Sequence, residues 1–141
     1  MQGKQQTNRE PRLQGKAAIV TGGGSHEGQV GTGRATAFCL AKEGAKVLVA
    51  DVSHENASRT VDEIRDDIGG VASVFTGDAT NNEDCRAMVK AAVEHYGGLH
   101  VLINNLGFGG SSSNAGLSKG ISGIDEEEWE RGFDLNNSSR A

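Results

Sequence analysis

The feature that most constrains this 141-residue chain is a glycine-rich turn set between an apolar strand and a helix. Residues 16–21 predict a buried strand, and the chain then turns through glycines between Gly22 and Gly33. A helix is expected over about 33–43, and a second buried strand over 46–51 ends on Asp51. A strand, a glycine turn, a helix and a second strand with an acid at its tip are typical of a dinucleotide-binding βαβ unit.

The rest of the chain continues to alternate strands with helices. Strands are expected over 71–76 and 99–104, and helices over 54–68 (capped by Ser53), from Asn81 or Asn82 to Tyr96, and from near Asp125 to Asn137. Residues at helical spacing form three stripes: Ala35, Phe38, Cys39 and Lys42; Ala57, Val61, Ile64 and Ile68; and Cys85, Met88, Val89, Ala92 and Tyr96. The last helix is expected to bury only Trp129 and Phe133. This alternation predicts an α/β fold with a parallel sheet and right-handed crossovers.

Composition narrows the class of protein further. Fourteen basic residues against nineteen acidic ones give a formal net charge of −5, so we expect no nucleic-acid partner. The apolar runs are short, and we expect no membrane association. Cys39 and Cys85 lack metal or redox spacing, which predicts two reduced core residues of a cytoplasmic protein and no metal site. Residues 1–12 are polar and are expected to form a flexible tail, which leaves 13–141 as one domain.

The glycine turn and two acids are the candidate cofactor site. Five turn residues are expected to cradle a pyrophosphate at the N-terminus of the following helix: Gly22, Gly24, Ser25, Gly31 and Gly33. Gly23 is expected to be a variable position without a special role. Asp51 is expected to accept hydrogen bonds from the adenosine ribose and to repel a 2′-phosphate, which favours NAD over NADP. Asp78, followed by Ala79, is expected to meet the adenine amino group. The alternatives are a glycine loop without a ligand, and an Asp78 that only forms a turn or neighbours a helix cap.

From Leu13 to Asn137, these motifs together resemble the classical short-chain dehydrogenase/reductase (SDR) family. The resemblance is carried by residues 15–22, the glycine turn, Asp51, Gly77-Asp78, residues 104–107, and Trp129 with Asp134-Leu135-Asn136. It implies a Rossmann-like doubly wound parallel sheet, incomplete at about four strands in the order 3-2-1-4. It also implies that Asn105 steadies the fourth strand, that the backbone of Leu106 and Gly107 passes the cofactor, and that Asn136 is the catalytic asparagine. The alternative for Asn136 is a frayed terminal residue. Two features depart from the family pattern. The glycine turn is five residues longer, at 26–30, and Leu106 replaces a usual alanine.

The resemblance also implies a catalytic tyrosine followed four residues later by a lysine. The single tyrosine, Tyr96, is followed four residues later by His100, and Tyr96 is expected to be a core or cap residue. We therefore expect the NAD-binding part of an SDR, truncated before the Tyr-x-x-x-Lys motif and inactive alone. The intact enzyme would transfer hydride between NAD(H) and a small alcohol or carbonyl substrate, and only the full-length form would be a homo-oligomer. The alternative is a non-catalytic dinucleotide-binding or interaction module stabilised by a partner.

Overall fold

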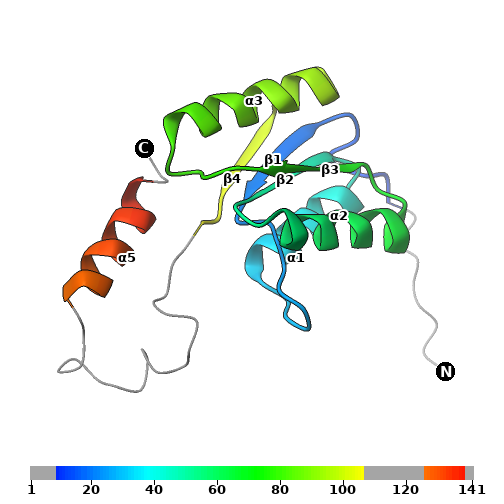
Figure 1. Cartoon of the computed structure of the whole chain (residues 1–141). Coiled ribbons are helices and arrows are strands. Elements are labelled where there is room, and N and C mark those ends of the chain that lie inside the picture. Colours follow the sequence, from blue (N-terminus) through cyan, green and yellow to red (C-terminus); the bar gives the residue numbers. More distant parts are fainter. Residues whose placement is uncertain (1–8, 107–125, 139–141) are drawn as a thin grey trace.

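The computed structural model describes residues 9–106 and 126–138 of the chain. Four parallel strands form one sheet in the order β3-β2-β1-β4, as the sequence predicted (Figure 1). The strands are β1 (Ala17–Thr21), β2 (Lys46–Asp51), β3 (Ala72–Thr76) and β4 (Val101–Asn104). In register, Ile19 of β1 lies between Leu48 of β2 and Leu102 of β4. This sheet confirms the predicted Rossmann-like α/β fold.

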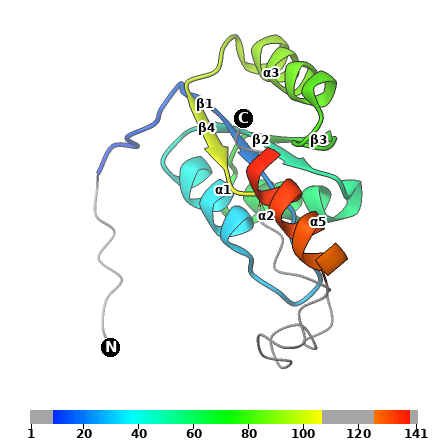
Figure 2. The same ribbon diagram turned by 90° about the vertical axis from the view of Figure 1, so that its left-hand side faces the viewer.

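Helices cover both faces of the sheet. The described helices are α1 (Thr32–Lys42), α2 (His54–Ile68), α3 (Asn82–Tyr96) and α5 (Glu126–Ser138), of which the first three cover the sheet. Each begins and ends within about one residue of its predicted bounds. α1 and α2 lie on one face and α3 lies on the opposite face, as two views at right angles show (Figures 1 and 2). The chain first winds from β1 outward to β3 and then crosses to β4 on the other side of β1. The carboxyl end of β1 is therefore the point at which an open α/β sheet offers a crevice.

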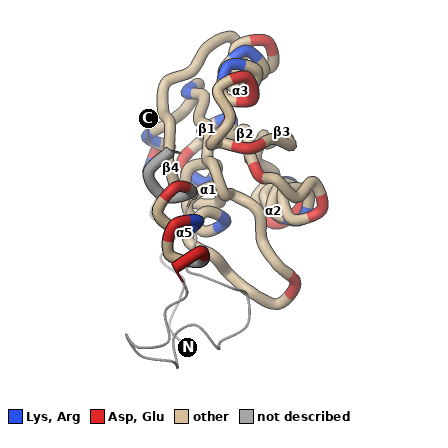
Figure 3. The backbone as a smooth tube through the Cα atoms, turned by 60° about the vertical axis from the view of Figure 1, so that its left-hand side comes forward, with Lys and Arg blue, Asp and Glu red and all other residues tan. Residues whose placement is uncertain are grey.

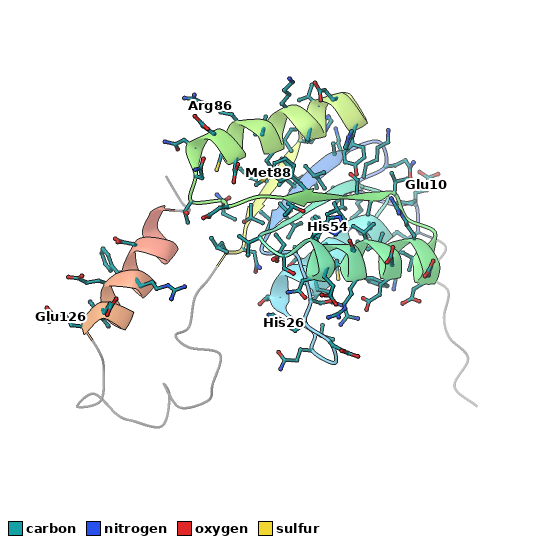
Figure 4. All side chains as sticks on the ribbon, in the orientation of Figure 1. Glu10, His26, His54, Arg86, Met88 and Glu126 are labelled. Carbon is teal, nitrogen blue, oxygen red and sulfur yellow. The ribbon has the colours of Figure 1, made fainter. Side chains whose placement is uncertain are left out.

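The core has two parts, one on each face of the sheet. Beneath α1 and α2, the buried residues include Val20, Val47, Val49, Ala37, Ala57, Val61 and Ile64. Beneath α3, Met88 and Ala92 pack on Ile19, Leu48 and Ala50, and Figure 4 shows Met88 between the helix and the strands. All five residues of β1 are buried, because this strand is covered on both faces.

Two predicted helix faces are corrected by the structure. α1 buries Gly33, Ala37 and Ala41. Of the predicted stripe, Phe38 packs partly against the core, but Cys39 is exposed, so its predicted core position is wrong. α1 packs closely and therefore turns its smallest residues inward. In α3, Val89 is 42% exposed and does not face the core.

Among the described residues, no helix is long and apolar enough to cross a bilayer, and no cluster of His, Cys, Asp and Glu could hold a metal ion. Acidic and basic residues are mixed along α2 and α3 (Figure 3). Trp129 and Phe133 of α5 are 62% and 61% exposed, so the expectation that this helix buries them is wrong in the described structure.

Candidate functional site

The glycine turn brings the start of α1 against the end of β1. Gly22 has a φ of +60°, which favours glycine. A Cβ atom on Gly33 would lie 2.0 Å from the Gly22 carbonyl oxygen and 2.5 Å from Asn105 Nδ2. Only a glycine at position 33 allows this close approach of helix to strand, which is one of the three roles of glycine in a dinucleotide-binding turn.

Gly23 is fixed in place, which corrects the expectation that it is a variable position. Its N–H donates to the Ala50 carbonyl oxygen at 3.1 Å, and its own carbonyl accepts a hydrogen bond from Thr60 Oγ1 at 2.8 Å. A Cβ atom at this position would lie 2.9 Å from Val49 Cγ1. The signal in the sequence was Thr60, a polar residue within the apolar stripe of α2 that is fully buried in the structure.

Asp51 ends β2 with its carboxylate held by two backbone N–H groups. Gly24 N donates to Oδ2 and Ser53 N donates to Oδ1, each at 3.0 Å. These bonds fix the orientation of a half-buried side chain. A carboxylate oxygen can accept more than one hydrogen bond, so both oxygens keep capacity for the hydroxyl groups of a ligand.

The N-terminus of α1 differs from the N-termini of α2 and α3. Ser53 and Asn81 cap α2 and α3 through their side chains, and acidic residues lie in the first turn of each. α1 begins after Gly31, no side chain in the described part of the chain caps it, and its first turn contains no acid. Unpaired N–H groups and the positive end of the helix dipole favour a bound anion. The start of α1 therefore fits a pyrophosphate group.

Asp78 lies after β3 and forms the turn that precedes α3. Its Oδ1 accepts hydrogen bonds from Thr80 N at 2.8 Å and from Thr80 Oγ1 at 2.7 Å. These bonds hold the pKa of the Asp78 carboxyl below its ordinary value. The contacts are those of the turn residue that the sequence allowed as an alternative, and they use one of the two carboxylate oxygens.

Asn105 joins the end of β4 to the glycine turn. Its backbone N–H donates to Thr21 Oγ1 and its side-chain Nδ2 donates to the Gly22 carbonyl, each at 3.1 Å. A small pocket lies where the carboxyl ends of the four strands meet. It is lined by Thr21, Gly22, Ala50, Asp51, Val52, Gly77, Ala79, Met88 and Leu106.

The structure therefore brings most of the predicted site residues to one edge of the sheet. Those in the pocket or the glycine turn are Gly22, Gly24, Ser25, Gly31, Gly33, Asp51 and Ala79, with Asp78 beside them and Asn105 bonded to the turn. Gly107 lies outside the described residues. Asn136 lies in α5, and its side chain is also outside them.

Tyr96 lies away from this edge, near the amino ends of the strands. Its hydroxyl donates to the Val47 carbonyl at 3.1 Å and contacts Ser73 Oγ at 2.5 Å. Burial raises the pKa of the Tyr96 phenol above its ordinary value. The prediction that Tyr96 is a core or cap residue is confirmed.

The five extra residues of the glycine turn have a defined path that the sequence did not reveal. Gln29 N donates to the His26 carbonyl at 3.1 Å and Gly28 has a φ of +73°, which closes a tight turn. Arg34 donates to the Gln29 carbonyl at 3.2 Å and forms two hydrogen bonds of 2.5 Å with the Glu63 carboxylate. The inserted residues are therefore bonded to Arg34 of α1, which is itself paired with Glu63 of α2.

Comparison with known proteins gives one consistent family. Residues 16–140 match the sequence profile described as short chain dehydrogenase. The chain is 34% identical over 125 residues to a cyclohexanol dehydrogenase of Acinetobacter sp. (strain SE19), which covers 89% of this chain and 45% of that protein. It is 37% identical over 99 residues to the 7alpha-hydroxysteroid dehydrogenase of Escherichia coli (strain K12), which covers 70% of this chain and 36% of that protein.

A solved structure agrees with these matches. A short chain dehydrogenase from Mycobacterium smegmatis superposes with a TM-score of 0.74 at 29% identity, which covers 92% of this chain and 50% of that one. The chain thus spans half or less of the length of each of these proteins.

Proposed function

Because the chain belongs to the short-chain dehydrogenase/reductase family, whose members use NAD(P), we propose that the whole protein is an NAD-dependent oxidoreductase. Its reaction would interconvert a small alcohol and the corresponding carbonyl compound, as the names of the similar dehydrogenases suggest. Bound NAD would supply the nicotinamide ring that accepts or returns the hydride. The described residues would form the part that binds and orients this cofactor.

The observation that carries this proposal is the start of α1, which is uncapped, free of acids and placed at the carboxyl end of β1. The pyrophosphate would bind there, between the glycine turn and the N–H groups of the helix. Asp51 would receive the adenosine ribose, because its carboxylate is already oriented by Gly24 and Ser53. Asp78 and Ala79 would border the adenine ring. Asn105, Gly107 and Asn136 would lie near the nicotinamide half of the cofactor.

The same geometry supports NAD in preference to NADP. The ribose 2′-phosphate of NADP would place negative charge beside the Asp51 carboxylate, which is unfavourable. Arg34 is the basic residue that follows the turn, and its guanidinium is already paired with Glu63. It would have to break this pair to bind a phosphate.

Two further parts of the proposal concern the whole protein. The tyrosine and lysine of the Tyr-x-x-x-Lys motif would lie outside this chain. Tyr96 does not take this role, because its hydroxyl donates to the Val47 carbonyl at the end of the sheet opposite the site. Two free cysteines, Cys39 and Cys85, support a reducing, cytoplasmic location. We also propose that the full-length form is a homo-oligomer.

Calorimetric titration of the chain with NAD and NADP tests the cofactor proposal. We expect saturable binding of NAD and weaker binding of NADP. Asp51→Ala should weaken NAD by about 10-fold or more, since two ribose hydrogen bonds to a charged group are lost. Asp66→Ala, which removes an exposed acid of α2, is the matched control and should bind as the wild type does. A folded sample that gives no binding heat with NAD would disprove the proposal.

A further inference from the structure

The inserted residues 26–30 come two residues after Gly24, which lies beside Asp51. A Cβ atom on Gly24 would lie 2.6 Å from Asp51 Oδ2 and 2.7 Å from Asn56 Cβ, so the acid and Asn56 flank the same glycine. Ser25 N then donates to the Asn56 carbonyl at 3.1 Å, which ties the turn to the first turn of α2. His26 follows at once, and its Nδ1 lies 3.5 Å from Asn56 Nδ2.

The position of His26 is fixed from both sides. The turn is closed by the bond from Gln29 N to the His26 carbonyl, and Arg34 holds the Gln29 carbonyl from α1. Figure 4 shows His26 on the loop that leads into α1. The imidazole is exposed, so its second ring nitrogen is open to a ligand.

We propose that His26 is a second ligand of the adenosine ribose, next to Asp51; this inference rests on the proposed function. Asn56 Nδ2 lies 3.5 Å from His26 Nδ1, and because an amide nitrogen can only donate, we assign the proton of a neutral ring to Nε2. The ring then offers an N–H donor on the same turn as Gly24, whose backbone N–H donates to the Asp51 carboxylate, a group that only accepts. Vicinal ribose hydroxyls both donate and accept, so they match such a pair. The inserted turn selects nucleotides with free 2′- and 3′-hydroxyl groups.

The test compares two ligands that differ only in those hydroxyl groups, AMP and 2′,3′-dideoxy-AMP. Calorimetry is done on the wild-type chain, His26→Ala, His26→Gln and the control Gln29→Ala, which alters a side chain of the same turn. We expect His26→Ala to weaken AMP by about 5- to 10-fold, as for one lost hydrogen bond, and to leave dideoxy-AMP unchanged. His26→Gln keeps a donor and should recover part of the affinity. Melting temperatures check that each variant is folded.

Three results would overturn the inference, and they separate it from the proposed function. If His26→Ala binds AMP as the wild type does while Asp51→Ala is impaired, the inference fails and the proposed function stands. If His26→Ala weakens both ligands equally, His26 only shapes the turn, and the inference fails. If the folded wild-type chain binds neither NAD nor AMP, the proposed function fails and takes the inference with it.

Discussion

Replacing Gly33 by alanine tests whether the close approach of α1 to β1 builds the site. The new Cβ would lie 2.0 Å from the Gly22 carbonyl oxygen, where real contacts stay beyond 3.0 Å, so helix or turn must move by roughly an ångström. Overpacking of this kind costs about 1–3 kcal/mol. The better helix propensity of alanine returns at most about 1 kcal/mol. We therefore expect a net loss of about 1–2 kcal/mol in the free energy of unfolding.

For a chain of this size, that loss corresponds to a melting temperature lower by roughly 4–8 °C. Cofactor affinity should fall as well, because the displaced helix carries the N–H groups proposed to bind the pyrophosphate. Gly31→Ala is the matched control for the unfolding measurement, since a Cβ atom there meets no atom within 4 Å and the residue has a φ of −80°. Urea unfolding followed by circular dichroism, and NAD titration, measure the two effects.

The reasoning would be refuted by a Gly33→Ala chain that unfolds and binds NAD as the wild type does. A loss equal to that of Gly31→Ala would refute it as well, because the effect would then not come from the contact with Gly22.

Two further predictions concern stability. Thr60→Val should lower the free energy of unfolding by about 1–3 kcal/mol, because the buried Gly23 carbonyl loses its donor. The control Thr36→Val removes an exposed hydrogen bond within α1 and should change this free energy by less than about 0.5 kcal/mol. Equal losses for the two variants in urea unfolding would contradict the prediction. Hydrogen bonds from Arg12 lower the pKa of Glu43 to about 2 from an ordinary 4.5, so the stabilisation by this pair is complete above about pH 5 and disappears as the pH falls toward 2. The melting temperatures of wild type and Glu43→Gln should accordingly differ at pH 7 and converge near pH 2, and a difference that grows with acid would show that the sign is wrong.

The sheet was predictable because its signals are local and strong. Buried runs such as the one around Ile19 predicted strands, and Ser53 and Asn81 predicted the starts of α2 and α3, where their side chains are indeed the caps. The strand order followed from the resemblance to the short-chain dehydrogenase/reductase family, because crossover handedness fixes the face on which a helix lies and not the order of the strands. Asp51 was found because an acid at the tip of the second strand has a fixed distance from the glycine turn.

The misses have a different physical origin. In α1, Cys39 and Ala37 lie on different faces, and spacing alone does not tell which face of a helix rich in small residues packs inward. Gly23 was misjudged because its partners, Ala50 and Thr60, are distant in the sequence and meet it only in the folded sheet. The path of residues 26–30 depends in the same way on a side chain, Arg34, that lies beyond them.

The uncapped start of α1 couples folding to the concentration of cofactor. α2 and α3 are completed by their own side chains, so their first N–H groups need no ligand to satisfy them. α1 leaves its first N–H groups for an anion to complete, and any ligand that binds only the folded form adds stability in proportion to the logarithm of its concentration. At 100 times its dissociation constant, such a ligand adds about 2.7 kcal/mol. The chain should therefore open first at the start of α1 when cofactor is scarce, and its turnover in a cell would follow the nucleotide pool.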